Sequence, residues 1–334
     1  MPAEPSAQLM GVLLGPVYAA AVAAVARFGI PDLLADGPKT AESIAAATGA
    51  KADLLYRLMR ATEAVGVLRR AANGMWEQTE LSALLRTDGP ETLRDLAIYW
   101  SDDWRTRAVA AMHKAVLTGE NAVELTYGMG PFEYLKSDPE AGLNFNRAMT
   151  SFSTTEVAAI LEAYDFSAFG SLVEIAGGHG LFLSAILESA PRLTATLLEL
   201  PQVLAEMSET PLRQHADRVS IVGGDMFSAV PAGGDAYLMK RIIHDWPDET
   251  AGMILSACRE AVNPGGKLLV IDAVVPEGPG FSTTKFLDVT MMIFSGGKER
   301  TAAEFRRLYA ANGWKLERIV PTASPMCVIE GVPA

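Results

Sequence analysis

Cysteine, histidine and basic residues are all scarce in this sequence of 334 residues. It has two cysteines, Cys258 and Cys327, and four histidines. Two isolated cysteines provide neither a disulfide framework nor a metal cluster, so we expect a cytoplasmic protein without a metal. Lys and Arg total 28 against 40 Asp and Glu, giving a net charge of −12. A chain this acidic repels phosphate backbones, which argues against nucleic acid as a partner.

Long uncharged runs are rare too, with one exception near the N-terminus. Residues 10–26 carry no charge, and the run approaches the length of a membrane span. It is rich in alanine, contains Gly15 and Pro16, and follows no basic segment, so neither a membrane span nor a signal peptide fits. We expect instead a helix buried against protein, with its apolar faces covered at a subunit interface.

The first third of the chain has the outline of a winged helix. Thr40 is placed to cap a short helix that Gly49 closes, a second helix covers 52–65, and a hairpin covers 67–78. A winged helix raises the alternative of a DNA-binding regulator. Residues 1–110 contain 11 basic and 13 acidic side chains, however, and lack the basic excess that DNA reading requires. A structural or dimerisation domain is the favoured interpretation.

The second half of the chain alternates between strands and helices. A long helix over 143–164 precedes it, after a linker marked by glycine and proline. Alternation of this kind predicts a mostly parallel sheet with helices on both faces, ending in an antiparallel hairpin at the edge. The expected strands are 171–176, 194–200, 219–222, 236–240, 267–273, 315–320 and 326–329, and the expected helices are 181–188, 250–262 and 302–312.

A glycine-rich turn follows the first of these strands. Gly177, Gly178 and Gly180 let a ligand approach the backbone, and the next helix offers free N–H groups. The spacing is not Gly-x-Gly-x-x-Gly, which disfavours a nicotinamide oxidoreductase. Glu199 ends the next strand, where an acid can bind ribose hydroxyls. Although a solvated strand-end carboxylate is the simpler alternative for Glu199 alone, turn and acid together favour a nucleoside cofactor.

Further polar residues follow the later strands. Asp225 is placed to accept a hydrogen bond from an adenine amino group, although it could also be an ordinary turn acid. His244 lies at the carboxyl end of a strand, where ligands sit in open α/β sheets, and an imidazole is a suitable base at neutral pH. Its alternative role is a helix cap. Asp272 and Glu299 either orient His244 or bind substrate, or serve structural roles such as stabilising a helix N-terminus.

These segments together resemble the class I S-adenosylmethionine (SAM)-dependent O-methyltransferases of the caffeic acid, hydroxyindole and bacterial polyketide-tailoring type. The resemblance covers nearly the whole chain. It rests on Glu174–Gly180, Glu199–Pro201, Gly224–Phe227, His244–Trp246, Asp272 and Gly296–Thr301. It implies a Rossmann-like, doubly wound SAM-binding α/β sheet (166–334), an N-terminal all-helical winged-helix dimerisation domain (1–110) and a helical linker (111–165) that contributes to the acceptor pocket.

The resemblance also implies roles for individual residues. The product would be S-adenosylhomocysteine (SAH), the acceptor a hydroxyl of a small aromatic molecule, and the assembly a homodimer. His244 matches the general base, with Asp272 and Glu299 as flanking acids. The cofactor would contact Ser153, Glu174, Gly177, Gly178, Gly180, Glu199, Asp225, Met226, Phe227 and Lys240, and the acceptor pocket would be bordered by Met149, Trp246, Met291 and Met292.

The sequence also departs from the family pattern. Ala176 stands where glycine is usual, so we expect this turn residue to avoid positive φ. Glu174 and Glu199 replace aspartates, and each lengthens the reach of its carboxylate by one methylene. Some relatives with this fold and cofactor methylate carbon or catalyse hydroxylation, so these reactions are the alternatives to O-methylation.

Overall fold

The computed structural model describes residues 4–89, 92–207 and 210–334, which form two compact units. The described parts of Met1–Ala110 and Phe132–Thr154 make the first unit, and Ala111–Pro131 with Thr155–Ala334 make the second. Residues 111–165, expected as one linker, are therefore shared between the two units.

The first unit is mainly helical. Its core surrounds Trp76, which is 1% exposed, and includes Leu55 and Met59. Thr40 accepts a hydrogen bond from the Ser43 N–H, as predicted for a cap. A hairpin of β1 and β2 has the predicted antiparallel pairing, so the unit is not purely helical. Its elements are α1 (Pro5–Leu13), α2 (Gly15–Arg27), α3 (Ile30–Leu33), α4 (Ala41–Thr48), α5 (Ala52–Glu63), β1 (Leu68–Arg70), β2 (Trp76–Gln78), α6 (Glu80–Ala83), α7 (Arg94–Trp100), α8 (Asp103–Ala110), α11 (Pro131–Ser137) and the start of α12 (Pro139–Ala163).

The uncharged N-terminal run does not form the single buried helix that we expected. It is divided between α1 and α2, which are bent by 45° at a break at Leu14. Gly15 and Pro16 begin the second helix, where proline is tolerated because its missing N–H has no partner in the first turn. Within one chain α1 buries no residue. No single described helix is long and apolar enough to cross a membrane.

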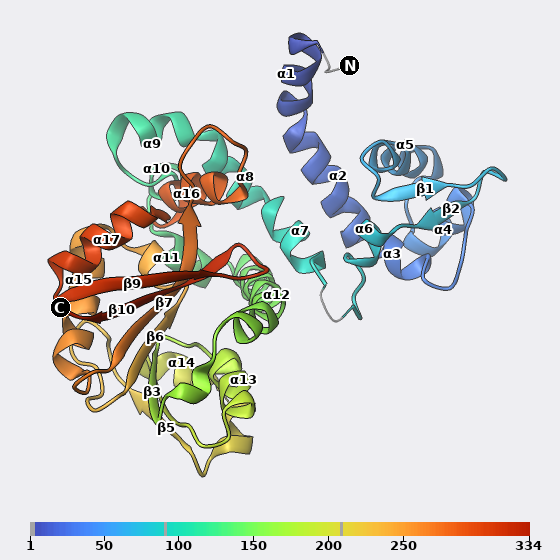
Figure 1. Ribbon diagram of the computed structural model, residues 1–334. Coiled ribbons are helices and arrows are strands. Elements are labelled where there is room, and N and C mark those ends of the chain that lie inside the picture. The colour runs from blue at the N-terminus through green and yellow to red at the C-terminus, as the bar shows by residue number, and fades with distance from the viewer. Residues whose placement is uncertain (1–3, 90–91, 208–209) are drawn as a thin grey trace. The chain divides into compact units, whose positions relative to one another are not determined.

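The second unit is built on a sheet with strand order β5-β4-β3-β6-β7-β10-β9 (Figure 1). The four pairings from β5 to β7 are parallel, and β10 is antiparallel to both of its neighbours, as the alternation predicted. The strands are β3 (Ser171–Ile175), β4 (Thr194–Glu199), β5 (Val219–Gly223), β6 (Ala236–Lys240), β7 (Lys267–Val275), β9 (Trp314–Pro321) and β10 (Met326–Pro333), and the short β8 (Arg300–Thr301) pairs with β7.

Helices cover both faces of this sheet. The helical elements of the unit are α9 (Met112–Thr118), α10 (Ala122–Tyr127), the end of α12, η1 (Phe166–Ala168), α13 (Leu181–Ser189), α14 (Pro201–Glu206), η2 (Pro211–His215), η3 (Ile243–Asp245), α15 (Asp248–Ala261), α16 (Thr283–Phe294) and α17 (Ala302–Ala311). The last of these begins with a capping box between Thr301 and Glu304.

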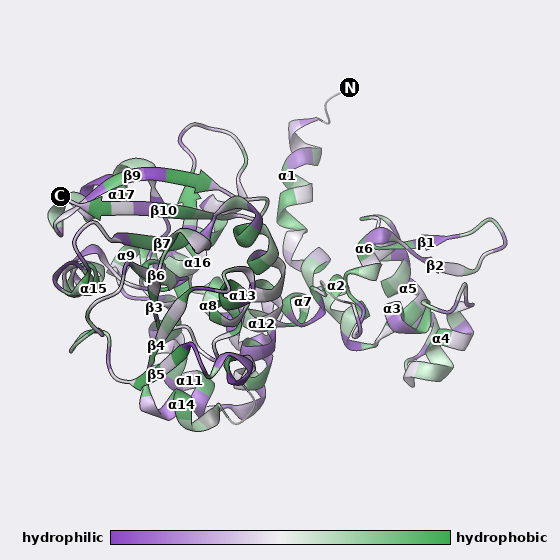
Figure 2. Ribbon diagram, turned by 60° about the horizontal axis from the view of Figure 1, so that its bottom comes forward, coloured by the Kyte–Doolittle hydropathy of each residue, from purple (hydrophilic) through white to green (hydrophobic). Residues whose placement is uncertain are grey.

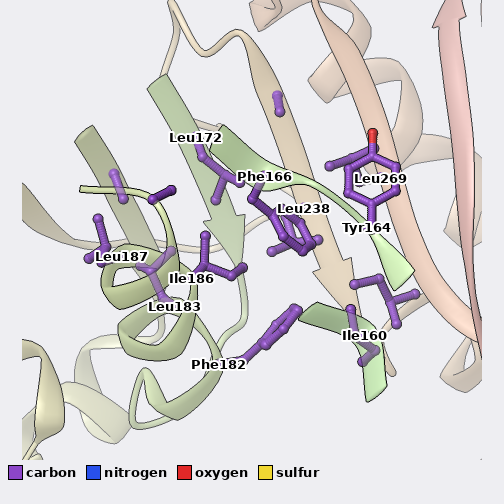
Figure 3. Close-up of a cluster of buried hydrophobic side chains, with 14 of the residues drawn as sticks. Ile160, Tyr164, Phe166, Leu172, Phe182, Leu183, Ile186, Leu187, Leu238 and Leu269 are labelled. Atoms are coloured by element: carbon purple, nitrogen blue, oxygen red, sulfur yellow. The ribbon is translucent and has the colours of Figure 1, made fainter. Parts of the chain in front are cut away.

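Alternate residues of each strand enter two separate cores. Leu172 and Leu238 pack against α13 and the end of α12 on one face (Figure 3). Val173 and Tyr237, their neighbours in sequence, pack against α15 and α17 on the other. Because both faces are covered, β3, β6 and β7 are hydrophobic along most of their length (Figure 2). The rigid sheet brings the carboxyl ends of its parallel strands to one edge, and the polar residues of the sequence analysis follow those ends.

Candidate active site

The glycine-rich turn joins β3 to α13 in a strained path. Gly178 and Gly180 have φ of 59° and 75°, and Ala176 has φ of 54°. The expectation that Ala176 avoids positive φ is therefore wrong. Its N–H donates to the Leu198 carbonyl at 2.8 Å, which ties the turn to β4 and offsets a backbone cost of about 1–2 kcal/mol.

Two acids support this turn. Glu199 accepts the Gly178 N–H at 2.8 Å and the N–H of Leu200 at 2.7 Å, so it holds the turn as well as lying where a ribose acid was predicted. Glu174 is 1% exposed, and its Oε2 has no hydrogen-bond partner among the described residues. A side chain at Gly177 would place its Cβ 2.3 Å from that oxygen, so any larger residue would force the buried Glu174 side chain to move. Burial raises the pKa of Glu174 to about 7.

An unsatisfied buried carboxylate beneath a bare backbone turn fits a ligand with a cationic group. SAM has such a group in its α-ammonium, and its ribose would meet Glu199. The residues present therefore fit the expected cofactor.

Aromatic and polar residues continue the edge beyond β5. Asp225 is exposed and accepts the N–H of Phe227 at 2.9 Å. The Phe227 ring packs edge-on against Trp246, with centroids 5.0 Å apart. The structure thus brings together a predicted cofactor residue and a predicted acceptor residue. Met226 is half-buried against the core that lies between the sheet and helices α15 and α17.

His244 lies in the three-residue turn η3, and its imidazole is surrounded by carboxylates. Nδ1 is 2.9 Å from Oε1 of Glu299 and 3.8 Å from Oδ1 of Asp272, whereas Nε2 is 3.9 Å from Oδ1 of Asp245. His244 is 5% exposed, Asp272 is fully buried and Glu299 is 3% exposed. The structure therefore assembles the histidine and both predicted acids from three separate segments.

These acids make His244 more basic than an ordinary imidazole, which the sequence analysis had assumed. Burial lowers the pKa of His244, but the charge of Asp272, the hydrogen bond to Glu299 and the charge of Asp245 outweigh it and raise the pKa to about 9. Burial in turn raises the pKa of Asp272 to about 7. The site is thus a histidine of increased proton affinity enclosed by acids.

Several supporting residues escaped the sequence analysis. Arg241 has a positive φ of 58°, and its guanidinium pairs with Glu156, which is 2% exposed. Lys240, predicted to line the cofactor site, is 3.4 Å from the same carboxylate. Arg300 is fully buried beside the His244 turn. Glu156 is 85 positions from Arg241, and the carbonyls of the His244 turn that Arg300 binds are 54 and 57 positions away, so no local pattern indicated these contacts.

The remaining predicted residues lie on two helices. Met291 and Met292 are half-buried on α16, which packs against β7 and α10. Met149 and Ser153 lie on the part of α12 that belongs to the first unit, and their roles remain predictions. Within the described ranges no group of His, Cys, Asp and Glu is arranged to hold a metal ion.

The strand order, the glycine-rich turn and the enclosed histidine define a class I SAM-dependent methyltransferase. Residues 110–315 match the family model of the O-methyltransferase domain, and residues 10–88 match the O-methyltransferase dimerisation domain. The chain belongs to this O-methyltransferase family, and its activity is SAM-dependent O-methylation.

Individual relatives support this assignment along the whole chain. Phenazine O-methyltransferase PhzM of Lysobacter antibioticus is 42% identical over 92% of this chain and 90% of its own length. CalO1, a methyltransferase of calicheamicin biosynthesis solved with SAH, is 35% identical, with a TM-score of 0.90 and coverage of 98% of each chain. NcsB1 of neocarzinostatin biosynthesis, solved with SAM and 2-hydroxy-5-methyl naphthoic acid, is 32% identical, with a TM-score of 0.76 and coverage of 95% of this chain and 96% of its own.

Proposed function

We propose that this enzyme methylates a hydroxyl of a fused-ring aromatic molecule, with His244 as the general base. The observation that carries the proposal is the buried imidazole, whose Nδ1 faces Glu299 and Asp272 at the carboxyl edge of the sheet. With Nδ1–H donated to Glu299, Nε2 is the nitrogen that accepts the proton of the acceptor hydroxyl.

We assign the cofactor to the turn between β3 and α13. Gly177, Gly178 and Gly180 line it, with Glu174 toward the amino group and Glu199 toward the ribose. Asp225, Met226 and Phe227 would hold the adenine and Lys240 would complete the site, whereas the assignment of Ser153 to it rests on the family resemblance alone. When bound, SAM supplies a methyl group that is already electrophilic, so the protein's own task is to provide and orient a nucleophilic oxygen.

The carboxylates around His244 make it a base matched to a phenol. A phenol has an ordinary pKa near 10. Proton transfer from such a phenol to His244, whose pKa is raised to about 9, therefore costs about 3 kcal/mol less than transfer to an imidazole with the ordinary pKa of 6.5. The opposing effect is that the raised pKa lowers the fraction of His244 that is neutral at pH 7. Asp272 and Glu299 therefore make His244 a stronger base, but they also lower the fraction of His244 that is neutral and able to accept a proton at pH 7.

The acceptor class follows from the pocket residues and the relatives. Trp246, Met291 and Met292 of the second unit would present an aromatic ring and adaptable thioethers to a flat ring system, whereas the assignment of Met149 to the acceptor pocket rests on the family resemblance alone. PhzM is named for a phenazine and NcsB1 was solved with a naphthoic acid, and both of these molecules are fused aromatic systems. The match to a dimerisation domain supports a homodimer formed through the N-terminal unit.

The test is turnover of a panel of naphthols, hydroxyphenazines and simple phenols with SAM. Mass spectrometry and NMR of the product would distinguish methylation on oxygen from methylation on carbon or nitrogen, or from hydroxylation. His244→Ala should lower kcat at least about 100-fold and leave the Kd for SAH within about twofold in calorimetry. His113→Ala, an exposed histidine on α9, is the matched control. Near wild-type turnover by His244→Ala would exclude the base role.

A further inference from the structure

The turn that carries His244 is too short to hold its own position. η3 spans three residues, Ile243–Asp245, and its internal bonds are those from the Asp245 and Trp246 N–H groups, at 3.2 and 3.3 Å. A turn of this length leaves most of its carbonyl groups without partners inside the turn. The orientation of the imidazole therefore depends on groups outside it.

Arg300 supplies these groups from the strand that follows Glu299. Its side chain is fully buried and forks over the turn. Nη1 donates to the Ile243 carbonyl at 3.0 Å, and Nη2 donates to the Trp246 carbonyl at 2.8 Å. Nε donates to Oδ1 of Asp248 at 2.9 Å, which balances the charge from the exposed side. One rigid guanidinium thus binds the turn on both sides of His244.

The backbone before Arg300 also contacts the His244 turn directly. The Lys298 N–H donates to the carbonyl of His244 itself at 2.9 Å. A Cβ at Gly297 would lie 2.0 Å from that carbonyl oxygen, so the two backbones touch there without room for a side chain. Between these contacts, Glu299 reaches Nδ1 of the imidazole at 2.9 Å. The segment from Gly297 to Arg300 therefore forms hydrogen bonds with both the backbone and the imidazole of His244.

We infer that Arg300 is a positioning residue that holds the His244 turn against the segment Gly297–Arg300, which carries Glu299, and so keeps the imidazole aligned with this acid. This inference deepens the proposed function and rests on it. Arg300 holds the turn through its backbone carbonyls and through Asp248, and its charge also lowers the pKa of Asp272. A planar guanidinium can bind two carbonyls and a carboxylate at once, whereas the single ammonium of lysine cannot hold all three in that geometry.

The test compares Arg300→Lys and Arg300→Gln with Arg259→Lys. Arg259 is a matched control because its Nε also donates to a backbone carbonyl, that of Gly313 at 2.9 Å, away from η3. We expect both Arg300 variants to bind SAH within about twofold of wild type but to lose at least about tenfold in kcat, since small misplacements at a reacting centre are costly. The acid limb of kcat/KM should also move to lower pH, because an imidazole released from Glu299 loses proton affinity.

A spectroscopic measurement separates positioning from a general loss of structure. The chain has four histidines, so ¹⁵N-histidine labelling gives few signals, and the signal missing from His244→Ala identifies His244. The Nδ1–H resonance of His244 should shift or broaden in both Arg300 variants and stay unchanged in Arg259→Lys. Arg300 variants that bind SAH and match the control in kcat, acid limb and resonance would overturn the inference.

Two further outcomes remain decisive. If neither Arg300 variant folds, Gly297→Ala tests the same contact between the segment Gly297–Arg300 and the His244 turn, because its methyl group would push the His244 carbonyl away. An unchanged kcat and an unchanged His244 resonance in that variant would refute the role of this contact. If His244→Ala keeps near wild-type turnover, the base role fails. The His244 resonance in Arg300→Lys then still shows whether Arg300 positions the turn.

Discussion

Replacing Glu299 with glutamine should weaken His244 as a base without removing it. The amide is nearly isosteric and its oxygen still accepts the Nδ1–H, but the negative charge 2.9 Å from the ring is gone. The pKa of His244 should fall, and the acid limb of kcat/KM, which reports the free enzyme, should move to lower pH.

The structure sets the size of this shift. The rise in the pKa of His244 from 6.5 to about 9 corresponds to about 3 kcal/mol and opposes a desolvation effect of the other sign. Three carboxylates, Asp245, Asp272 and Glu299, share it. Loss of one of them should move the limb by about one pH unit. A weaker base also lowers the high-pH plateau, by about threefold if half of the lost basicity appears in the transition state.

The assay is kcat/KM for the acceptor from pH 6 to 10 at saturating SAM. Two acceptors with different hydroxyl pKa values are needed, because a limb that follows the acceptor belongs to the acceptor. Glu260→Gln, an exposed position on α15, controls for the substitution. If the Glu299→Gln limb coincides with wild type while SAH still binds, then Glu299 does not set the basicity of His244.

Two stability predictions follow from other parts of the second unit. Ala176→Gly should raise the free energy of unfolding or leave it unchanged, because relief of the strained φ of 54° offsets the entropy cost of glycine. The control Ala158→Gly, at an exposed position on α12, should instead lower the free energy of unfolding by about 1 kcal/mol in urea unfolding. An equal loss at both positions would contradict the strain argument. Glu330→Gln should lose about 2 kcal/mol at pH 7, since buried Glu330 accepts hydrogen bonds from Lys267 and Tyr164. Burial raises the pKa of Glu330, but these partners outweigh it and lower the pKa, so the difference between variant and wild type should shrink below pH 4.5; a difference that is constant with pH would refute this.

The sequence alone predicted the strands and main helices of the second unit and the polar residues that follow its strands. Short apolar strands and capped helices depend on neighbours a few residues apart, so the positions of β3 to β7 and the cap at Thr40 could be predicted locally. His244 and Asp272 were found because parallel strands place their carboxyl ends at one edge, a rule that holds before any packing is known.

Only the tertiary structure decided how these residues act. The buried partnership of His244 with Glu299 joins positions 55 apart, and its effect on pKa depends on exclusion of water by the surrounding chain. Arg300 and Gly297 derive their roles from carbonyls of a distant turn, and Ala176 accepts a strained φ because β4 holds it. Sequence patterns reflect the conformational preferences of neighbouring residues, whereas the proton affinity of His244, the strain at Ala176 and the contacts of Arg300 arise from groups that meet only after folding.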